Sequence, residues 1–212
     1  MAKSIRAQVE AIIEEFESRP EGLLKHVRRV LDEALDLARH WDIDPERTQL
    51  ATWGHDLFRA HAPADLLRLS REAGVAIGPE DEAAPIMLHG PLAAAVMRER
   101  FKVTDDEALA AVRDHTAGLA QMPMLAKVIL IADKVEKRKR TRTPVMEAIR
   151  RIARRDLDLA LLCWADWKWV DERAHGYDSY TAHWHAREEW VRAHHAEAGL
   201  PGRIPGWQYD LD

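Results

Sequence analysis

The stretch Trp53-Gly54-His55-Asp56-Leu57-Phe58-Arg59 places a histidine beside an aspartate, with apolar residues on both sides of the pair. Burying either side chain is unfavourable unless a partner satisfies its polar atoms. Four other imidazole and carboxylate groups occur along the chain in similar apolar settings. We therefore predict that six side chains converge on one metal site: His26, His55, Asp56, His89, His115 and Asp133.

Apolar residues recur at helical spacing through most of the chain, and no segment is a convincing strand. In a helix predicted over residues 23–41, His26 lies at the edge of the apolar stripe. In a helix predicted over residues 45–58, His55 points toward the core and Asp56 is turned about 100° from it. The pattern predicts an all-α chain without internal repeats.

Gly54 is unfavourable inside a helix, which indicates that another helix or a ligand approaches closely there. Further helices are predicted from Ile5 to Ser18, from Asp65 to Ala73, from His89, from a capping box at Thr104, from Pro123, from Thr143-Pro144 to about Val170, and from Tyr180 to Ala198. We expect residues 1–160 to form a metal-binding helical domain. Residues 161–212 would add helices that pack on the same domain, followed by an extended tail.

The composition limits the class of protein. With 212 residues, 32% charged and 47% hydrophobic, the chain has the balance of a soluble globular domain. A net charge of −5 argues against nucleic acid as a partner. No apolar stretch is long enough to span a bilayer and no signal peptide is evident, so we expect a cytoplasmic protein without a membrane partner. Cys163 is the single cysteine and is expected to be an inert buried thiol.

Imidazole nitrogens and carboxylate oxygens without a thiolate favour iron, manganese or zinc. A lone histidine on an apolar helix face is more often a satisfied core residue than a ligand. The prediction therefore depends on the recurrence of such groups over five segments, which a shared cation would satisfy together.

Four pieces of the chain resemble the HD-domain metal-dependent phosphohydrolases, and within them the YqeK-like symmetrical diadenosine tetraphosphate hydrolases, which yield two ADP. The pieces are Gly54-His55-Asp56-Leu57-Phe58-Arg59, Leu88-His89-Gly90-Pro91-Leu92-Ala93-Ala94, Ala111-Val112-Arg113-Asp114-His115-Thr116-Ala117-Gly118 and Ile131-Ala132-Asp133-Lys134-Val135-Glu136. The resemblance covers roughly residues 20 to 160. It implies an HD-domain helical bundle, here with additional C-terminal helices.

The resemblance also implies roles for individual residues. An iron-type divalent ion, with manganese as an alternative, would be held by His26, His55, Asp56 and Asp133. His89 and His115 would bind either a second ion or the substrate phosphates. The catalytic set would be Asp56, Arg59, His89 and His115.

Substrate contacts would come from Arg59, His89, His115, Thr116, Glu136, Lys139 and Arg140. Arg59 and Thr116 would face phosphate, and either Lys139 or Arg140 would match an arginine of the family. Glu136 would orient a ligand or a ribose hydroxyl, or else form a salt bridge to the basic run. The basic run itself is equally compatible with a solvated helix end.

The chain departs from the family pattern at substrate contacts rather than at metal ligands. Leu23 stands where the family often has an arginine, Lys137-Arg138-Lys139 replaces a Pro-Gly turn, and residues 176–184 lack a clear nucleotide-contacting counterpart. The prediction is a metal-dependent hydrolase of a nucleotide phosphoanhydride, with diadenosine tetraphosphate as the implied substrate. The alternatives are an HD phosphohydrolase for another nucleotide, a nucleotide-binding regulatory protein without turnover, and a purely structural helical protein.

A late cluster of aromatic and histidine residues has two interpretations. Packing in a core and a dimer interface is favoured because tryptophan usually acts by burial, and homodimers are common among the enzymes resembled. The second interpretation is an adenine-stacking wall. The cluster comprises Trp164, Trp167, Trp169, Trp184, Trp190, His175, His183, His185, His194 and His195.

Overall fold

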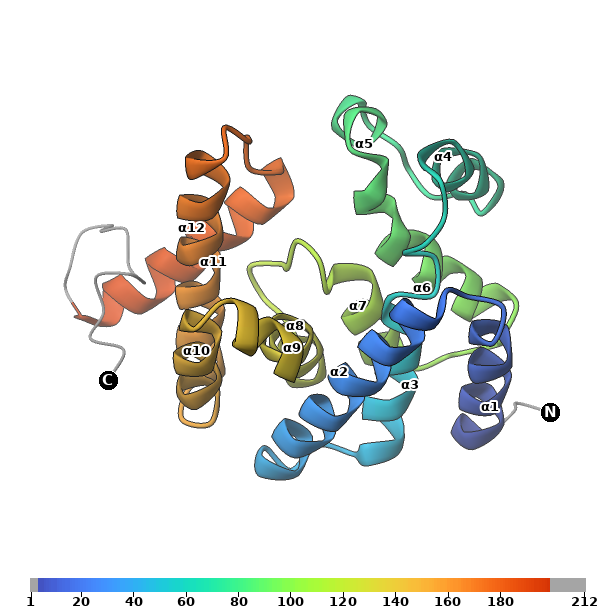
Figure 1. Cartoon of the computed structure of the whole chain (residues 1–212), viewed down its shortest axis with the longest axis horizontal. Coiled ribbons are helices and arrows are strands. Elements are labelled where there is room, and N and C mark those ends of the chain that lie inside the picture. Colours follow the sequence, from blue (N-terminus) through green and yellow to red (C-terminus); the bar gives the residue numbers. More distant parts are fainter. Residues whose placement is uncertain (1–3, 199–212) are drawn as a thin grey trace.

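The computed structural model describes residues 4–198, with side chains up to residue 190, and within these residues it contains helices and no strand (Figure 1). The prediction of an all-α chain is confirmed. The helices are α1 (Ile5–Phe16), α2 (Glu21–His40), α3 (Pro45–His55), α4 (Pro63–Glu72), α5 (Pro79–Ala83), the 3-10 helix η1 (Pro85–Leu88), α6 (His89–Glu99), α7 (Asp106–Asp114), α8 (Met124–Val135), α9 (Lys137–Arg142), α10 (Val145–Ala153), α11 (Leu157–Ala174) and α12 (Thr181–Ala198).

Helix α8 occupies the centre of the molecule (Figure 1). Its consecutive residues Ile129, Leu130, Ile131 and Ala132 are all fully buried. A helix that is apolar on every side requires neighbours on every side, and α8 packs against α2, α3, α7, α10 and α11. The carboxyl end of α8 thereby brings Asp133 into the interior, next to the helices that carry the histidines.

Gly54 allows α3 to approach α6 and α7 closely. A Cβ atom built on Gly54 would lie 2.2 Å from the sulfur of Met97 and 3.0 Å from a methyl carbon of Val112. The prediction that a helix approaches Gly54 is confirmed. The contact holds the end of α3 between the two helices that carry His89 and His115.

Several predicted helix boundaries differ from the structure. Helix α3 ends at His55 rather than at Phe58, because the following residues form tight turns with bonds from Leu57 N to Gly54 O and from Arg59 N to Asp56 O. Helix α7 is capped by Asp105 rather than by the predicted Thr104: the Asp105 carboxylate accepts from Ala108 N at 3.1 Å.

The helix predicted from Thr143-Pro144 to about Val170 is two helices, α10 and α11. Asp156 interrupts it, since its carboxylate accepts a hydrogen bond from Leu159 N at 2.9 Å and caps α11. The basic run forms the separate short helix α9, capped by Glu136.

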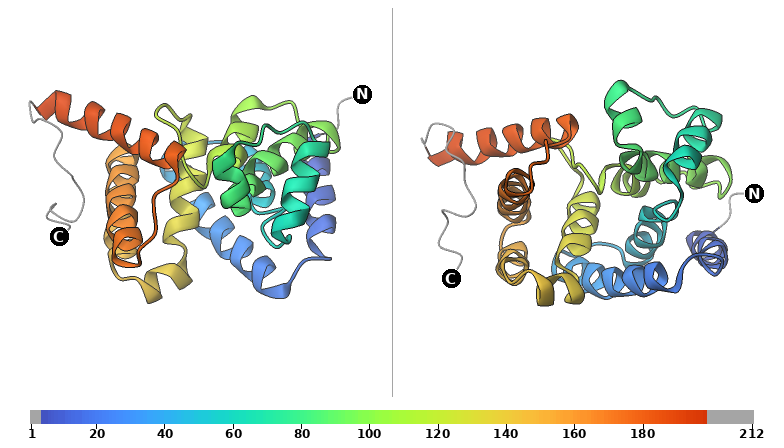
Figure 2. Two further views of the ribbon diagram at one scale, coloured as in Figure 1. Left: turned by 90° about the horizontal axis from the view of Figure 1, so that it is seen from above. Right: turned by 45° about the horizontal axis from the view of Figure 1, so that its top comes forward.

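Helices α10, α11 and α12 lie together on one side of α8, and α4 and α5 lie on the opposite side of the molecule (Figures 1 and 2). Trp164 and Trp190 are buried in this C-terminal part, and the ring centroids of Trp169 and Trp184 are 6.2 Å apart. These positions favour the packing interpretation of the late aromatic cluster. The predicted tail, residues 201–212, and the side chains of His194 and His195 lie outside the described residues.

Cys163 is buried, as predicted, and burial raises the pKa of its thiol to about 12. None of the helices described between residues 4 and 198 combines the length and apolar character that crossing a membrane requires.

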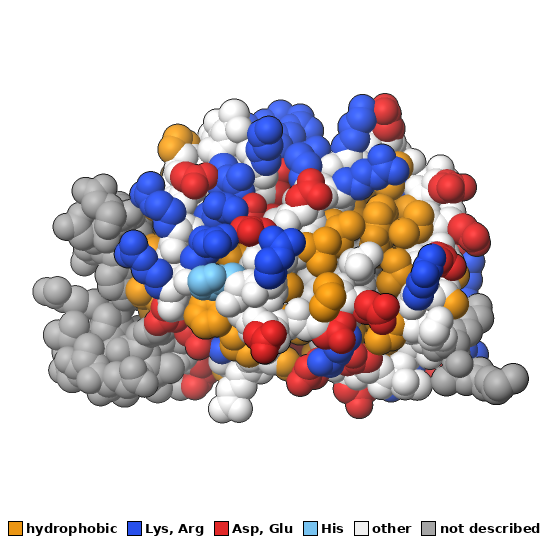
Figure 3. Space-filling model, turned by 90° about the horizontal axis from the view of Figure 1, so that it is seen from below, with side chains coloured by type: hydrophobic (Ala, Val, Ile, Leu, Met, Phe, Trp, Pro, Cys, Tyr) orange, Lys and Arg blue, Asp and Glu red, His pale blue; other side chains and the backbone are white. Residues whose placement is uncertain are grey.

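Charged side chains of both signs gather over α9 and α10 on the face shown in Figure 3. Glu33 of α2 lies within this group and accepts from Arg140 at 2.7 Å and from Arg150 at 2.5 Å. Asp36 accepts from Arg150 at 3.0 Å and from Arg154 at 2.5 Å. These arginines are engaged in ion pairs that join α9 and α10 to α2.

Candidate metal centre

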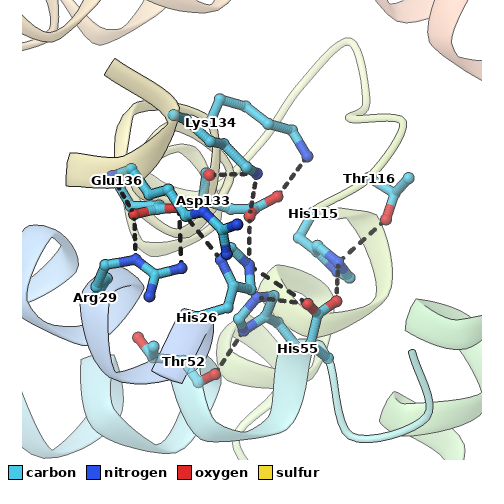
Figure 4. A network of polar contacts seen from close by, with 12 residues as sticks. His26, Arg29, Thr52, His55, His115, Thr116, Asp133, Lys134 and Glu136 are labelled. Atoms are coloured by element: carbon cyan, nitrogen blue, oxygen red, sulfur yellow. Dashed lines mark hydrogen bonds and ion pairs between the residues drawn. The ribbon is translucent and has the colours of Figure 1, made fainter. Parts of the chain in front are cut away.

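The six side chains predicted to converge lie close together in the structure. Figure 4 shows four of them, His26, His55, His115 and Asp133. The six side chains reach a common point from four helices and two helix ends, and all are buried except His26, which is partly exposed. Their positions are His26 in α2, His55 at the last residue of α3, Asp56 directly after it, His89 at the first residue of α6, His115 directly after α7, and Asp133 in the last turn of α8.

Asp56 is the central group because its two carboxylate oxygens face different pairs of histidines. Oδ2 lies 3.5 Å from Nε2 of His26 and 3.6 Å from Nε2 of His55. Oδ1 lies 3.2 Å from Nε2 of His89 and 3.5 Å from Nε2 of His115. One carboxylate therefore joins two groups of potential ligands, each with its donor atoms within 4.8 Å of one another.

Three of the histidines are oriented by the backbone three residues earlier. Nδ1 of His55 donates to Thr52 O at 2.6 Å, Nδ1 of His115 donates to Val112 O at 2.7 Å, and Nδ1 of His89 donates to Ile86 O. A ring that donates from Nδ1 presents the lone pair of Nε2 on its other side. All three Nε2 atoms face Asp56, which is the orientation that a metal ligand needs.

His26 is oriented by a carboxylate instead. Its Nδ1 lies 3.5 Å from Oε1 of Glu136, and Nε of Arg29 donates to Oε2 of the same carboxylate at 2.7 Å. Its Nε2 lies 3.1 Å from Oδ1 of Asp133. Glu136 is therefore placed to orient the predicted ligand His26, which is one of the roles expected for it from the sequence. Its salt bridge is formed with Arg29 of α2 rather than with the basic run.

The donor set fits a cation by its protonation states. Burial lowers the pKa of His55 and lowers that of His115 to about 3, so both rings are neutral near pH 7. Burial raises the pKa of Asp56, but His55, His115 and His89 outweigh it and hold that pKa well below its ordinary value. Neutral imidazoles around an ionised carboxylate are the forms that bind metal.

One atom of the site is left without a hydrogen-bond partner. Nε2 of His55 is fully buried and has none among the described residues. A buried acceptor without a partner is rare and unfavourable. A cation placed between His55, His26 and Asp56 would satisfy it, so the residues present fit a bound divalent ion.

Asp133 is also contacted by two lysines. Nζ of Lys134 donates to Oδ2 at 2.6 Å, and Nζ of Lys139 donates to Oδ1 at 2.7 Å and to the Asp133 carbonyl at 2.6 Å. Burial raises the pKa of Asp133, but Lys134 and Lys139 outweigh it and hold the pKa well below its ordinary value. The carboxylate is therefore ionised and surrounded by positive charge.

A cavity of about 440 Å³ opens onto these groups, a size typical of small-molecule sites. Arg59 lines the cavity, is exposed, and has no carboxylate at ion-pair distance among the described residues. Across the site, Oγ1 of Thr116 lies 3.1 Å from Nε2 of His115 and 3.4 Å from Nε2 of His89. The cavity is lined by Pro20, Gly22, Leu23, His26, Asp56, Arg59, Ala60, Asp133, Lys134 and Lys139.

Lys139 and Arg140, the two residues of the basic run expected at the substrate, have different surroundings in the structure. Lys139 lines the cavity, whereas the guanidinium of Arg140 donates to Glu33 at 2.7 Å and to the Val135 carbonyl at 2.6 Å. The geometry therefore favours Lys139 and does not support a substrate contact for Arg140. Arg140 instead joins α9 to α2.

Sequence reasoning missed two cations near the predicted ligands: Lys134 contacts Asp133, and Arg29 contacts Glu136. Lys134 directly follows Asp133, but adjacent helical residues point about 100° apart, so the sequence alone did not place the two side chains together. Arg29 lies three residues after His26 and shares its helix face, but its partner Glu136 is distant in the sequence. Only the packing of α2 against α8 brings these two together.

Comparison with models of protein families identifies the class to which this protein belongs. The HD domain family model matches residues 23–138, more than half of the chain. The chain belongs to the HD domain family and is a metal-dependent phosphohydrolase.

Individual relatives narrow the comparison. The chain is 30% identical over 140 residues to a protein of Halalkalibacterium halodurans named bis(5'-nucleosyl)-tetraphosphatase, symmetrical, which covers 65% of this chain and 72% of that protein. It is 32% identical over 120 residues to a protein of the same name from Staphylococcus aureus, covering 57% of this chain and 61% of that protein.

A solved structure supports the fold alone. A Clostridium acetobutylicum protein described as a predicted HD superfamily hydrolase involved in NAD metabolism superposes with a TM-score of 0.80 at 23% identity. The superposition covers 91% of this chain and 100% of the other, so the similarity extends into the C-terminal helices.

Proposed function

We propose that this chain hydrolyses a dinucleoside polyphosphate, with diadenosine tetraphosphate as the first candidate, and cleaves it symmetrically into two ADP molecules. The names of two relatives support the substrate. The observation that carries the proposal is the position of the Asp56 carboxylate. Each of its two oxygens faces a different pair of histidines, and the carboxylate lines a cavity that also contains positively charged side chains.

We assign the metal ligands to His26, His55, Asp56 and Asp133, with His89 and His115 holding either a second ion or the phosphates. Iron is our first choice and manganese the alternative, because the donors are nitrogen and oxygen without sulfur. The bound ion would supply Lewis-acid activation of a water molecule and of the phosphoryl oxygen. Glu136 acts through His26, whose ring it orients.

The chain's own cations offset the charge of the polyphosphate. Arg59 lines the cavity and has no carboxylate partner within the described part of the chain, and Lys139 lines the same cavity beside Asp133. Fixed positive groups that face developing negative charge stabilise the transition state of phosphoryl transfer. Thr116, within hydrogen-bond distance of both His89 and His115, is placed to donate to a phosphate oxygen that those rings approach.

The test is hydrolysis of diadenosine tetraphosphate by protein loaded with Fe²⁺ or Mn²⁺, with the products separated by chromatography. We expect ADP as the sole nucleotide product and loss of activity in a chelator. His55→Ala should lose both the metal and the turnover. Formation of AMP and ATP instead would refute the symmetrical cleavage.

His61→Ala provides a matched control. His61 lies six positions after His55 and also donates from Nδ1 to a carbonyl three residues earlier, that of Phe58, at 3.2 Å. Its Nε2, however, lies 3.3 Å from a nitrogen of Arg19 rather than facing Asp56. His61→Ala should keep the metal and the turnover, whereas equal losses in the two variants would contradict the ligand assignment.

The same assay can also support the alternative of a nucleotide-binding regulatory protein without turnover. Leu23, which lines the cavity where the family often has an arginine, favours this alternative. Tight nucleotide binding by metal-loaded protein without product over a long incubation would select it. A cytosolic location, a homodimer and a division of the chain at residue 160 remain predictions, which fractionation, size-exclusion chromatography and limited proteolysis would test.

A further inference from the structure

The turn that follows His115, residues 116–118, lies against helix α12. In both views of Figure 2 the loop after α7 runs beside the beginning of that helix. Nδ1 of His183 in α12 donates to the carbonyl of Ala117 at 3.1 Å. A Cβ atom on Gly118 would lie 2.6 Å from the ring of Trp190, so α12 contacts this turn at two points.

The turn is part of the site, because it carries Thr116 and directly follows His115. Its backbone is closed by a bond from Gly118 N to Asp114 O at 2.7 Å, with Gly118 in the left-handed region at φ 77°. The carbonyl that His183 holds follows Thr116 by one residue. Displacement of that carbonyl would therefore move the Thr116 hydroxyl relative to the rings of His89 and His115.

His183 is itself an unusual residue to bury. Its ring is 1% exposed and packs edge-on against Trp164, with ring centroids 5.0 Å apart. Burial lowers its pKa to about 3, so the ring is neutral and carries one proton. Nε2 has no hydrogen-bond partner among the described residues. An apolar side chain would avoid that unfavourable burial. The one hydrogen bond that a histidine gains here over an apolar residue, among the described residues, is the bond from Nδ1 to Ala117.

Trp164, which packs against His183, also contacts a lysine of the site. Its ring lies under Nζ of Lys134 at 5.3 Å from the centroid, and Lys134 donates to Asp133. The C-terminal helices therefore contact the site through two neighbouring side chains. Of the two, only His183 makes a directional bond to the chain segment that carries Thr116.

We propose that His183 is a positioning residue for the reaction: by holding the Ala117 carbonyl it fixes the turn that carries Thr116 beside His89 and His115. This inference rests on the proposed function for its substrate. It gives a residue of the C-terminal helix α12 a role in the reaction, although the predicted metal ligands all lie earlier in the chain, at residue 133 or before.

The test compares His183→Leu with His183→Asn. Leucine fills a similar volume without a donor, whereas the side-chain amide of asparagine can donate to the same carbonyl. We expect His183→Leu to lower kcat for diadenosine tetraphosphate about 10- to 100-fold, as a small misplacement of a catalytic group does. KM should change less than about 3-fold, because the cavity walls stay in place, and His183→Asn should recover most of kcat.

Tyr180→Phe is the matched control. Tyr180 donates from its hydroxyl to Asp81 of α5 at 2.6 Å, directly before α12 begins. Its loss weakens the attachment of the same helix without touching Ala117, so kcat should stay at the wild-type value. The melting temperature of His183→Leu should change little, because loss of the bond to Ala117 is offset by removal of the unpaired nitrogen.

Hydrogen exchange gives a readout that needs neither metal nor nucleotide. Peptides that cover residues 114–120 should exchange faster in His183→Leu than in wild type, His183→Asn or Tyr180→Phe. Unchanged exchange, or an equal loss of kcat in Tyr180→Phe, would overturn the role of His183. If wild-type protein hydrolyses no dinucleotide, the proposed function fails, and exchange in the turn still decides the positioning.

Discussion

Gly90 is the position where a single methyl group should separate activity from stability. It is the second residue of α6, directly after His89, and it packs against the carboxyl end of α7. A Cβ atom there would lie 2.7 Å from the carbonyl oxygen of Arg113 and 3.0 Å from that of Val112. Both contacts are with backbone, so Gly90→Ala can be accommodated only if α6 and the end of α7 move apart.

The displacement falls on the site. The same Cβ would lie 3.3 Å from Cε1 of His115, and the Val112 carbonyl that it contacts is the acceptor for Nδ1 of His115. His89 is the preceding residue, and its Nε2 lies 3.0 Å from Nε2 of His115. Separating the two helices therefore widens the distance between these rings and alters their orientation toward Asp56.

The expected changes differ in size. Overpacking costs roughly 1–3 kcal/mol, and alanine gains about 1 kcal/mol over glycine in a helix. The net loss of unfolding free energy is on the order of 1 kcal/mol, which lowers Tm by about 2–4 °C for a chain of this length. A displacement approaching 1 Å lowers kcat/KM about 100-fold. Activity should therefore fall far more than stability.

The assay is kcat/KM for diadenosine tetraphosphate together with urea denaturation of the same preparation. Gly78→Ala serves as the control, because its Cβ would meet nothing closer than 3.6 Å and its φ of −100° suits any residue. That variant should keep its activity and change in stability by less than about 0.5 kcal/mol. Wild-type kcat/KM in Gly90→Ala would refute the reasoning, as would an activity loss explained by unfolded protein.

Two further predictions concern single carboxylates. Glu136→Gln should weaken metal binding about 10- to 100-fold, because the variant loses the ion pair with Arg29 and the charge that orients His26. The metal affinity is measured by competition with a chelator, and a wild-type affinity in the variant would contradict this. Asp105→Ala removes the cap of α7 and should cost about 1–2 kcal/mol at pH 7. The hydrogen bonds from Arg47 lower the Asp105 pKa, so this stabilisation is complete above the ordinary value of 3.8 and is lost as pH falls through the lower folded-state value. The unfolding free energies of wild type and variant should therefore begin to converge as the pH falls below about 4; a constant difference would exclude the ion pair.

The sequence predicted the helical class and the six converging side chains, because both follow from local periodicity and from the cost of burying polar groups. It named Arg59 and Lys139, which line the cavity, but it did not predict the ion pairs that join distant helices around the site. The partners Arg29 and Glu136, or Glu33 and Arg140, are more than a hundred residues apart and meet only through helix packing. Rules for neighbouring helix positions reach only three or four residues.

The adjacency of His55 and Asp56 illustrates why a helix boundary can decide a site. Consecutive helical residues point about 100° apart, which keeps neighbouring side chains from facing one point. The structure resolves this by ending α3 at His55 and placing Asp56 outside helical geometry, at φ −107° and ψ 18°. The carboxylate then turns back to the ring of His55 and also reaches the rings of His89 and His115. Periodicity locates a helix end only to within about two to four residues, and here the three residues between the predicted end at Phe58 and the observed end at His55 include the central group of the site. The apolar residues after Asp56 favour continuation of the helix, whereas in the structure the chain turns there, with bonds from Leu57 N to Gly54 O and from Arg59 N to Asp56 O.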